Sequence, residues 1–360
     1  LDHFKIKIDE YVKHHDSHAA AGYFTSPFAD QGATILTVDA IGEWDTVSIS
    51  TAEKIWIEKK ETIKYPHSIG ILYSAFTQRC GLKPAEEEYI LMGMAAYGEP
   101  KYKKDIYNDF VHQSPLALKK NLHRGLGDWH PEADPMDIAA SIQAVTEELL
   151  ANLWSKAASY LPPKGLMYPK HNLVFGGGVA LNCAANSKLA NLGIFDDIWI
   201  MPNPGDCGSS LGAAALQYGR RLHWKGPYLG HDLGDKYPVD AVIGGLITDK
   251  IVGVASGRTE FGPRALGTRS LLADPRGEDI KDRVNAIKKR QEFRPFAPMI
   301  LEEHADEVFE MYHDKSQPYM QLVYPCKQPD LYPAIVHADG TSRVQTVGKQ
   351  DHPGVRKLLE

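Results

Sequence analysis

Long apolar segments are missing from this sequence. No run of about 18 to 20 apolar residues, the length that spans a bilayer, occurs in its 360 residues. The chain does not open on the pattern of a signal peptide either. Basic residues are not in excess, because 40 lysines and arginines are set against 46 acidic residues, for a net charge of −6. These absences argue against a membrane partner and make nucleic acid an unlikely one.

Cysteine is also scarce. The four cysteines are scattered and show no Cys-x-x-Cys spacing, which argues for reduced thiols and a cytoplasmic location. The length predicts about two domains. The chain begins without methionine and stops within a helix-like segment. We therefore expect a fragment of a longer protein, truncated at both ends.

Three histidines occur within residues 14–18. His14 and His18 are four residues apart, which places them on one face of a helix, where two imidazoles can converge on one metal ion. The alternative is a solvated helix start capped by Asp16 or Ser17. His15 is a candidate general base, although a supporting or solvated role fits the pattern equally well.

Strand-like and helix-like periodicities alternate along the chain and predict an α/β protein. The expected strands are 4–12, 33–39, 46–50, 54–61, 172–175, 197–201 and 251–255. The expected helices are 19–24, 68–80, 85–94, 137–161, 209–218 and 278–287. Residues 112–135 read as a loop or lid, and the Gly-, Pro- and His-rich residues 220–248 hold the expected domain boundary.

Three turns that follow buried strands have the character of ligand sites. One strand ends in Asp39 and turns through Gly42, so a carboxylate and backbone N–H groups could contact Mg²⁺ or phosphate there. An ordinary hairpin turn explains this pair as well. The glycines at 176–178 let a ligand approach the backbone ahead of a helix. Asp206 follows the strand at 197–201, on the side of the sheet where ligands bind in α/β folds.

Arginines and glycines are interleaved in residues 257–270. Arginine forks suit bidentate recognition of phosphate, and Gly262 and Pro263 imply a rigid, shaped site rather than a loose basic loop. We expect phosphate binding here and in the basic segment 288–298. The candidate residues are Arg258, Arg264, Arg269, Lys289 and Arg294.

Eight motifs in colinear order together resemble one family. They are HHDSHAAAGYFTSPF, VDAIGEWD, LMGMAAYG, DIAASIQAV, FGGGVALNCAANSKL, PNPGDCGSSLGAA, GRTEFGPRALGTRSLLADPR and KKRQEFRPFAP. The chain resembles the carbamoyltransferases of nodulation factors and antibiotics over roughly residues 8 to 346. The resemblance implies an α/β protein with an actin/hexokinase-like (ASKHA) domain over 1–235, followed by part of a YrdC-like α/β domain over 236–360.

The resemblance also implies an activity. Carbamoyl phosphate and ATP with Mg²⁺ would form carbamoyl adenylate in the YrdC-like part. The other domain, which holds a divalent metal (Fe²⁺ by analogy with the relatives), would then pass the carbamoyl group to a hydroxyl of a small acceptor such as a sugar or an antibiotic. The sequence does not identify the acceptor, whose contacts could lie in 112–135 or 220–248. A homodimer is left open.

The resemblance assigns residues by position. The metal ligands fall on His14, His18 and Asp206. The tRNA-modifying relatives also use a tyrosine, whose place is held by Thr37 here, which puts a fourth protein ligand in doubt. The nucleotide and anion positions fall on Gly176, Gly177, Gly178, Asn182, Arg258, Arg264, Arg269 and Lys289. The residues themselves, rather than the resemblance, suggest catalytic roles for His15 and Asp39 and ligand contacts at Gly42 and Arg294.

Two other functions remain compatible with the residues alone. An actin-like small-molecule kinase would need the Asp and Gly loops, but it has no use for the paired histidines. A non-catalytic nucleotide-binding remnant would keep the glycine loop without the chemistry. A measurement of the metal content of the protein would distinguish the kinase and the non-catalytic remnant from the carbamoyltransferase.

Overall fold

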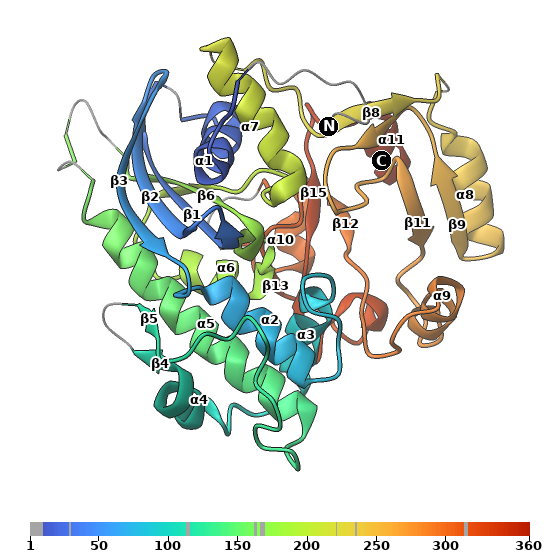
Figure 1. Ribbon diagram of the computed structural model, residues 1–360. Coiled ribbons are helices and arrows are strands. Elements are labelled where there is room, and N and C mark those ends of the chain that lie inside the picture. Colours follow the sequence, from blue (N-terminus) through green and yellow to red (C-terminus); the bar gives the residue numbers. More distant parts are fainter. Residues whose placement is uncertain are drawn as a thin grey trace, which may run out of the picture.

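The computed structural model (Figure 1) describes residues 10–28, 30–112, 116–161, 164–165, 170–220, 222–234, 236–312 and 316–360. The strand expected at 4–12 lies mostly outside the described residues. Its last part, from residue 10, is not a strand, because irregular chain there leads into the first helix.

The described chain alternates helices and strands. The helices are α1 (His14–Thr25), α2 (Ile69–Arg79), α3 (Glu88–Met94), α4 (Lys103–Phe110), α5 (Pro135–Ala158), α6 (Cys183–Ala190), α7 (Asp206–Tyr218), α8 (Val239–Thr248), α9 (Ile280–Lys288), α10 (Ala305–Val308) and α11 (Pro353–Leu359). The strands are β1 (Ala33–Gly42), β2 (Asp45–Glu53), β3 (Trp56–Lys64), β4 (Val111–His112), β5 (Ala117–Leu118), β6 (Asn172–Gly176), β7 (Asp197–Trp199), β8 (Tyr228–Asp232), β9 (Ile251–Ala255), β10 (Arg258–Glu260), β11 (Arg269–Ala273), β12 (Met299–Leu301), β13 (Tyr324–Pro325), β14 (Thr341–Ser342) and β15 (Gln345–Val347).

A five-stranded mixed sheet in the order β3-β2-β1-β6-β7 forms the centre of the first half. Strands β1, β2 and β3 make the antiparallel meander expected from their alternation, whereas β1, β6 and β7 run parallel. Both faces of β1 are buried, which explains its nearly continuous apolar sequence. The carboxyl ends of β1 and β6 therefore meet at one edge of the sheet.

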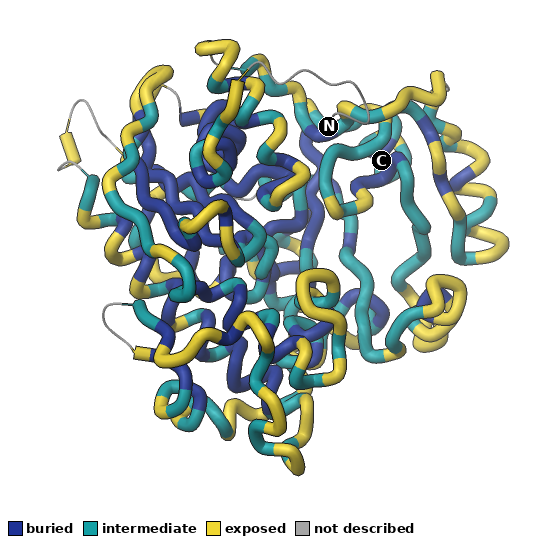
Figure 2. The backbone as a smooth tube through the Cα atoms, in the orientation of Figure 1, coloured by how far each residue is buried: buried dark blue, intermediate teal, exposed yellow. Residues whose placement is uncertain are grey.

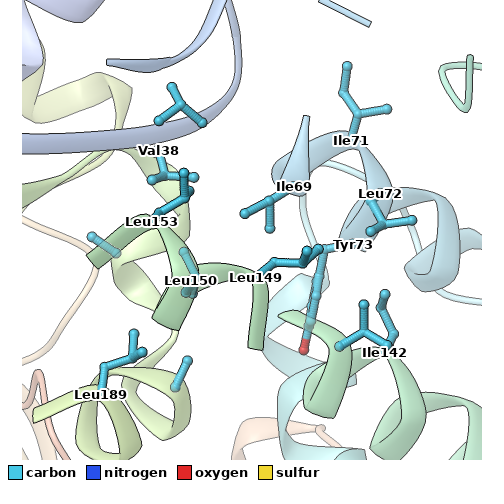
Figure 3. Close-up of a cluster of buried hydrophobic side chains, with 14 of the residues drawn as sticks. Val38, Ile69, Ile71, Leu72, Tyr73, Ile142, Leu149, Leu150, Leu153 and Leu189 are labelled. Carbon is cyan, nitrogen blue, oxygen red and sulfur yellow. The ribbon is translucent and has the colours of Figure 1, made fainter. Parts of the chain in front are cut away.

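Helices cover both faces of this sheet, so the first half has three layers (Figure 1). On one face, Val38 of β1 packs with Ile69 of α2 and with Leu149 and Leu153 of α5 (Figure 3). On the other face, Ile35 belongs to a second core cluster with residues of α1 and α7. The alternation of strand side chains thus divides the core into two compartments.

Helices α1 and α7 pack unusually close together because a glycine lies at their contact. A Cβ added at Gly212 of α7 would come within 1.8 Å of the Ser17 carbonyl oxygen and 2.5 Å of the Ala21 nitrogen. Any side chain there would push the helices apart. Since α1 begins at His14 and α7 begins at Asp206, this contact fixes the separation of two predicted metal ligands.

The second half has smaller sheets than the first. Strands pair as β8 with β10, β9 with β11, β12 with β15 and β13 with β14. Buried backbone is concentrated in the first half, while the second half is mostly of intermediate exposure (Figure 2). The α/β class is confirmed, as a mixed architecture around one central mixed sheet.

The structure corrects several expected boundaries. Helix α1 begins at His14 rather than at residue 19, and α7 begins at Asp206 rather than at residue 209. Residues 220–248, expected to be irregular, contain β8 and the helix α8. The sequence of α8 is apolar around most of its circumference and carries Gly244 and Gly245, so no helical period was visible in it.

Candidate metal centre

Three elements that are distant in sequence meet at the carboxyl edge of the sheet. Helix α1 provides His14 and His18 from one face of its first turns, as the spacing predicted. Strand β1 provides Asp39 near its end, and α7 provides Asp206 as its first residue. These four side chains form one group in which the possible ligand atoms all lie within 4.8 Å of one another.

The separations within this group suit a bound ion. The Nε2 atoms of His14 and His18 are 3.0 Å apart. The distances from these two nitrogens to the carboxylate oxygens of Asp39 and Asp206 run from 3.1 to 3.5 Å. Four ligands placed tetrahedrally around an ion, with bonds of about 2.0–2.2 Å, would be separated by about 3.3–3.6 Å. Two imidazoles and two carboxylates are also a suitable donor set for a divalent transition metal.

The side chains of the four ligand candidates differ in solvent exposure, so one side of the site is buried and the other is open. The side chain of His18 is 1% exposed and that of Asp39 is 11% exposed, whereas that of Asp206 is 74% exposed. Burial acts to lower the pKa of His18, but hydrogen bonds to Asp206 and Asp39 outweigh it and raise that pKa to about 9. Burial likewise acts to raise the pKa of Asp39, yet its bonds to the two histidines hold that pKa well below its usual range. The Asp39 carboxylate is therefore ionised and ready to bind a cation.

The turn after β1 packs against His14. A Cβ on Gly42 would lie 2.2 Å from Cδ2 of the His14 ring, so the glycine makes room for the imidazole. The carboxylate of Glu43 accepts the backbone N–H of His14 at 3.2 Å and also the hydroxyl of Tyr11. Glu43 takes a left-handed conformation with φ of 50° to do so. The Gly42 position predicted for nucleotide binding thus lies against a metal-ligand candidate.

This contact leads to a prediction for Gly42→Ala. The added methyl group would displace the His14 ring, and we expect metal affinity to fall about 10- to 100-fold, as it does when the support of a ligand is lost. Titration of the apoprotein with Fe²⁺ under anaerobic conditions would measure this. Gly253→Ala is the matched control, because a Cβ at Gly253 meets nothing within 4 Å. Equal affinities for the two variants would contradict the prediction.

His15 points away from the two ligand candidates of its motif, His14 and His18. Its Nδ1 lies 3.2 Å from the Ser48 hydroxyl, its Nε2 has no hydrogen-bond partner, and the residue is 1% exposed. Burial lowers its pKa to about 4, against the opposing charge of Asp39. The ring therefore lies in the interior behind His14 and His18, which fits the supporting role better than that of a general base in contact with an acceptor.

The two glycines that follow β6, Gly177 and Gly178, lie beside Val38 and Asp39 near the end of β1. Gly177 has a φ of 86° and a Cβ there would come within 2.2 Å of the Val38 carbonyl oxygen, while a Cβ on Gly178 would lie 3.1 Å from Oδ1 of Asp39. Only glycine fits such an approach. Asn182 caps α6 by accepting the Ala185 N–H at 3.0 Å and exchanges hydrogen bonds with Gln143.

A cavity of about 1510 Å³ connects this site with the second half of the chain. On the first-half side it is lined by Asp39, Gly178, Asn182 and Asp206. On the second-half side it is lined by basic residues, namely Arg264, Arg276, Lys288, Lys289, Arg290, Arg294 and Arg343. The metal-ligand candidates and the predicted anion residues thus face one common space.

Two arginines of this cavity have unsatisfied groups. Among the residues that the structure describes, the buried Nε atoms of Arg264 and Arg343 have no hydrogen-bond partner. Burial lowers the pKa of Arg264 to about 9, and the charges of Arg343 and Arg294 add to the effect. Buried cations that repel one another and lack an acidic partner are costly unless an anion joins them. Together with Arg290, these three residues form what we call the arginine cluster.

Two predicted anion ligands have other roles. Arg269 donates to the carbonyl oxygens of Ser256, Thr268, His231 and Gly257. Arg258 donates to the Gly230 carbonyl oxygen at 3.2 Å. Neither lines the cavity, so both hold the loop that carries Arg264. Lys289 does line it and ends α9 in a left-handed conformation.

Thr37 does not reach the site. It is fully buried in β1, and its hydroxyl oxygen has no partner. The carboxylate two residues later, Asp39, lies where a fourth ligand would be. Sequence reasoning had placed Asp39 at a catalytic or Mg²⁺ position and had named neither Arg343 nor Arg290 as a candidate. Arg290 stood inside the basic segment 288–298, but Arg343 follows the short strand β14 and carries no motif.

Comparison with known proteins agrees with this arrangement. Residues 3–215 match the family described as Carbamoyltransferase N-terminus, and residues 244–360 match Carbamoyltransferase C-terminus. The chain belongs to the carbamoyltransferase family. The prediction of a carbamoyltransferase is therefore confirmed at the level of the family, whose N-terminal part holds the metal-centre candidate and whose C-terminal part holds the arginine cluster.

Several curated relatives of this carbamoyltransferase chain extend over most of its length. Nodulation protein NolNO of Sinorhizobium fredii is 33% identical over 94% of the chain and 55% of that protein. Nodulation protein NolO of Bradyrhizobium diazoefficiens is 31% identical over 95% of the chain and 68% of its own length. The uncharacterized protein sll1178 of Synechocystis is 35% identical, with coverages of 97% and 68%. The chain thus spans between about half and two thirds of these relatives.

In the part of the chain that the structure describes, no helix combines the length and apolar character required to cross a lipid bilayer.

Proposed function

We propose that this protein transfers a carbamoyl group to a hydroxyl of a small-molecule acceptor. The observation that carries the proposal is the cavity shared by a His/His/Asp/Asp group and an arginine cluster. The first can hold a divalent metal ion and the second can hold a phosphate-bearing donor. A carbamoyltransferase needs both, whereas a small-molecule kinase would have no use for the histidines.

The arginine cluster supplies the donor side. Carbamoyl phosphate and ATP would be bound there through their phosphates. One water would first hydrolyse carbamoyl phosphate to carbamate and inorganic phosphate, and a carbamate oxygen would then attack the α-phosphate of ATP, which forms carbamoyl adenylate and releases pyrophosphate. The buried Nε atoms of Arg264 and Arg343 would find their missing acceptors in phosphate oxygens. The enclosure by protein also excludes water from an activated carbamoyl group that water would otherwise hydrolyse.

The metal-centre candidate supplies the acceptor side. His14, His18, Asp39 and Asp206 would hold the ion, for which Fe²⁺ is our choice, and a bound ion acts as a Lewis acid that lowers the pKa of a hydroxyl. In the transfer, the acceptor oxygen would form a bond to the carbonyl carbon, the bond from that carbon to the phosphate oxygen would break, AMP would leave, and the hydroxyl proton would be released to water. The exposed side of the site at Asp206 is where the acceptor would enter.

The fold assignment follows the same division. We propose that the first half, to about residue 235, is the ASKHA-type domain and that the second half is part of a YrdC-like domain. The glycines at 177 and 178, which bring backbone close to Asp39 at the cavity wall, are where ATP or its AMP product with Mg²⁺ would approach the metal. The two family matches leave the interval 216–243 between them, which contains the proposed boundary.

Mass spectrometry tests the proposal directly. The protein is incubated with carbamoyl phosphate, ATP and Mg²⁺, first alone and then with a metabolite extract. We expect carbamoyl adenylate in the first case and a mass gain of one carbamoyl group on an extract component in the second. Production of ADP and a phosphorylated acceptor instead would favour a kinase and overturn the proposal.

A further inference from the structure

The arginine cluster belongs to the second half in sequence, but the first half holds part of it in place. Resting on the proposed function, we propose that Tyr89 of α3 and Tyr97 of the adjoining 3₁₀ turn (Ala95–Tyr97) are positioning residues for Arg294. In this assignment the donor phosphate site is completed across the interface between the two halves. The motif LMGMAAYG, which had no function assigned from sequence, then gains one.

The first contact is between a ring and a cation. The guanidinium carbon of Arg294 lies 4.8 Å from the centroid of the Tyr89 ring, which is the geometry of a cation–π interaction. Tyr89 is 45% exposed and both residues line the cavity. The exposed Tyr89 ring at the cavity wall orients the Arg294 guanidinium, which faces the proposed anion site.

The second contact fixes the backbone next to Arg294. The Tyr97 hydroxyl donates to the carbonyl oxygen of Phe293 at 2.9 Å, and the two rings meet edge to face at 5.6 Å. Gly93 of α3 lies against the same ring, since a Cβ there would be in ordinary van der Waals contact with Phe293 at 3.5 Å. The chain at 293–294 is thereby attached to α3 and the turn that follows it.

Arg264, like Arg294, is held by a contact with the first half of the chain. Arg290 instead is held by contacts within the second half. Arg264 donates to the carbonyl oxygen of Leu181 in the first half at 3.3 Å. Arg290 is held within the second half: its Nε donates to Asn285 at 2.6 Å, one Nη donates to the Pro295 carbonyl oxygen at 3.2 Å, and its guanidinium lies 4.5 Å from the Phe296 centroid. The cluster therefore combines cations anchored by both halves.

Kinetics of carbamoyl adenylate formation test this assignment. Tyr89→Leu removes the ring face, and we expect the KM for carbamoyl phosphate to rise about three- to tenfold with kcat nearly unchanged. Tyr89→Phe keeps the ring but loses the hydroxyl that hydrogen-bonds Arg294, so its KM should rise less than that of Tyr89→Leu. Tyr97→Phe loses one hydrogen bond to the Phe293 backbone and should raise KM about two- to fivefold. Calorimetric titration with inorganic phosphate makes the same comparison without turnover.

Tyr107→Phe is the matched control, because the Tyr107 hydroxyl donates to Glu148 at 2.8 Å on a surface away from the cavity. Its KM and phosphate affinity should equal those of wild type. An unchanged KM in Tyr89→Leu, or an equal rise in Tyr89→Leu and Tyr89→Phe, would overturn the inference. If Arg264→Ala also leaves phosphate binding intact, the proposed donor site itself is wrong. If Arg264→Ala loses binding while Tyr89→Leu does not, only the positioning role fails.

Discussion

Replacement of both candidate histidines, His14→Ala with His18→Ala, is expected to remove the metal and abolish carbamoyl transfer. Each histidine contributes a nitrogen within 3.5 Å of both carboxylates, so two carboxylates alone would remain to bind a transition metal. We expect the metal content to fall from about one equivalent to background. Transfer should fall at least about 100-fold, because the Lewis acid is lost. Elemental analysis and a carbamoylation assay measure the two effects.

A control separates this loss from general damage to the protein. His304→Ala removes an exposed histidine that pairs with Glu307 in the second half and is not part of the metal-centre candidate. Its metal content should match that of wild type. If the double variant retains the same metal content as His304→Ala, the metal assignment is wrong. Adenylate formation by the double variant should persist, since the arginine cluster is untouched.

The second large effect is expected from Arg264→Ala. Arg264 is partly buried, its buried Nε has no hydrogen-bond partner among the described residues, and Arg343 and Arg294 are its charged neighbours. Loss of a charge-assisted fork to phosphate should reduce carbamoyl adenylate formation about 100-fold or more. Transfer from pre-made carbamoyl adenylate should be largely spared. Pyrophosphate release measures the first step, and carbamoylated product measures the second.

Arg283→Ala is the matched control for this variant. Arg283 lies on α9, donates to the Asp249 carbonyl oxygen at 3.0 Å and does not line the cavity. It should leave both steps unchanged. Equal loss of both steps in Arg264→Ala would contradict the division of labour between the arginine cluster and the metal-centre candidate. If the urea unfolding midpoint of Arg264→Ala fell below that of Arg283→Ala, the loss of activity would instead reflect a loss of structure in the loop that carries residue 264.

The features that sequence predicted well are those set by local spacing. The paired histidines needed only the 3.6-residue period of one helix to be placed on a common face. The meander followed from alternation, and the glycines at 176–178 followed from the need for close backbone approach. The colinear motifs were enough to identify the family that the comparisons then established.

Tertiary structure decided which of these parts work together. Asp39 is 25 residues from His14 and Asp206 is 188 residues from His18, and no local period connects them. The parallel pairing of β1 with β6 and the close contact of α1 with α7 bring them to one edge. That arrangement gives Asp39 a place among the metal-ligand candidates, where the sequence had put it at a separate turn.

The arginines show more clearly what the sequence alone cannot determine. Composition alone cannot tell an arginine that faces a ligand from one that binds backbone carbonyls, because both roles use the same fork of donors. In the structure, Arg269 uses its donors on the loop, whereas Arg264 and the unpredicted Arg343 keep buried donors unpaired. The sequence by itself determined the family, the α/β class and the histidine pair, since these depend on local order along the chain. Only the tertiary structure decided which charges share one cavity, because that depends on contacts between residues far apart in the chain.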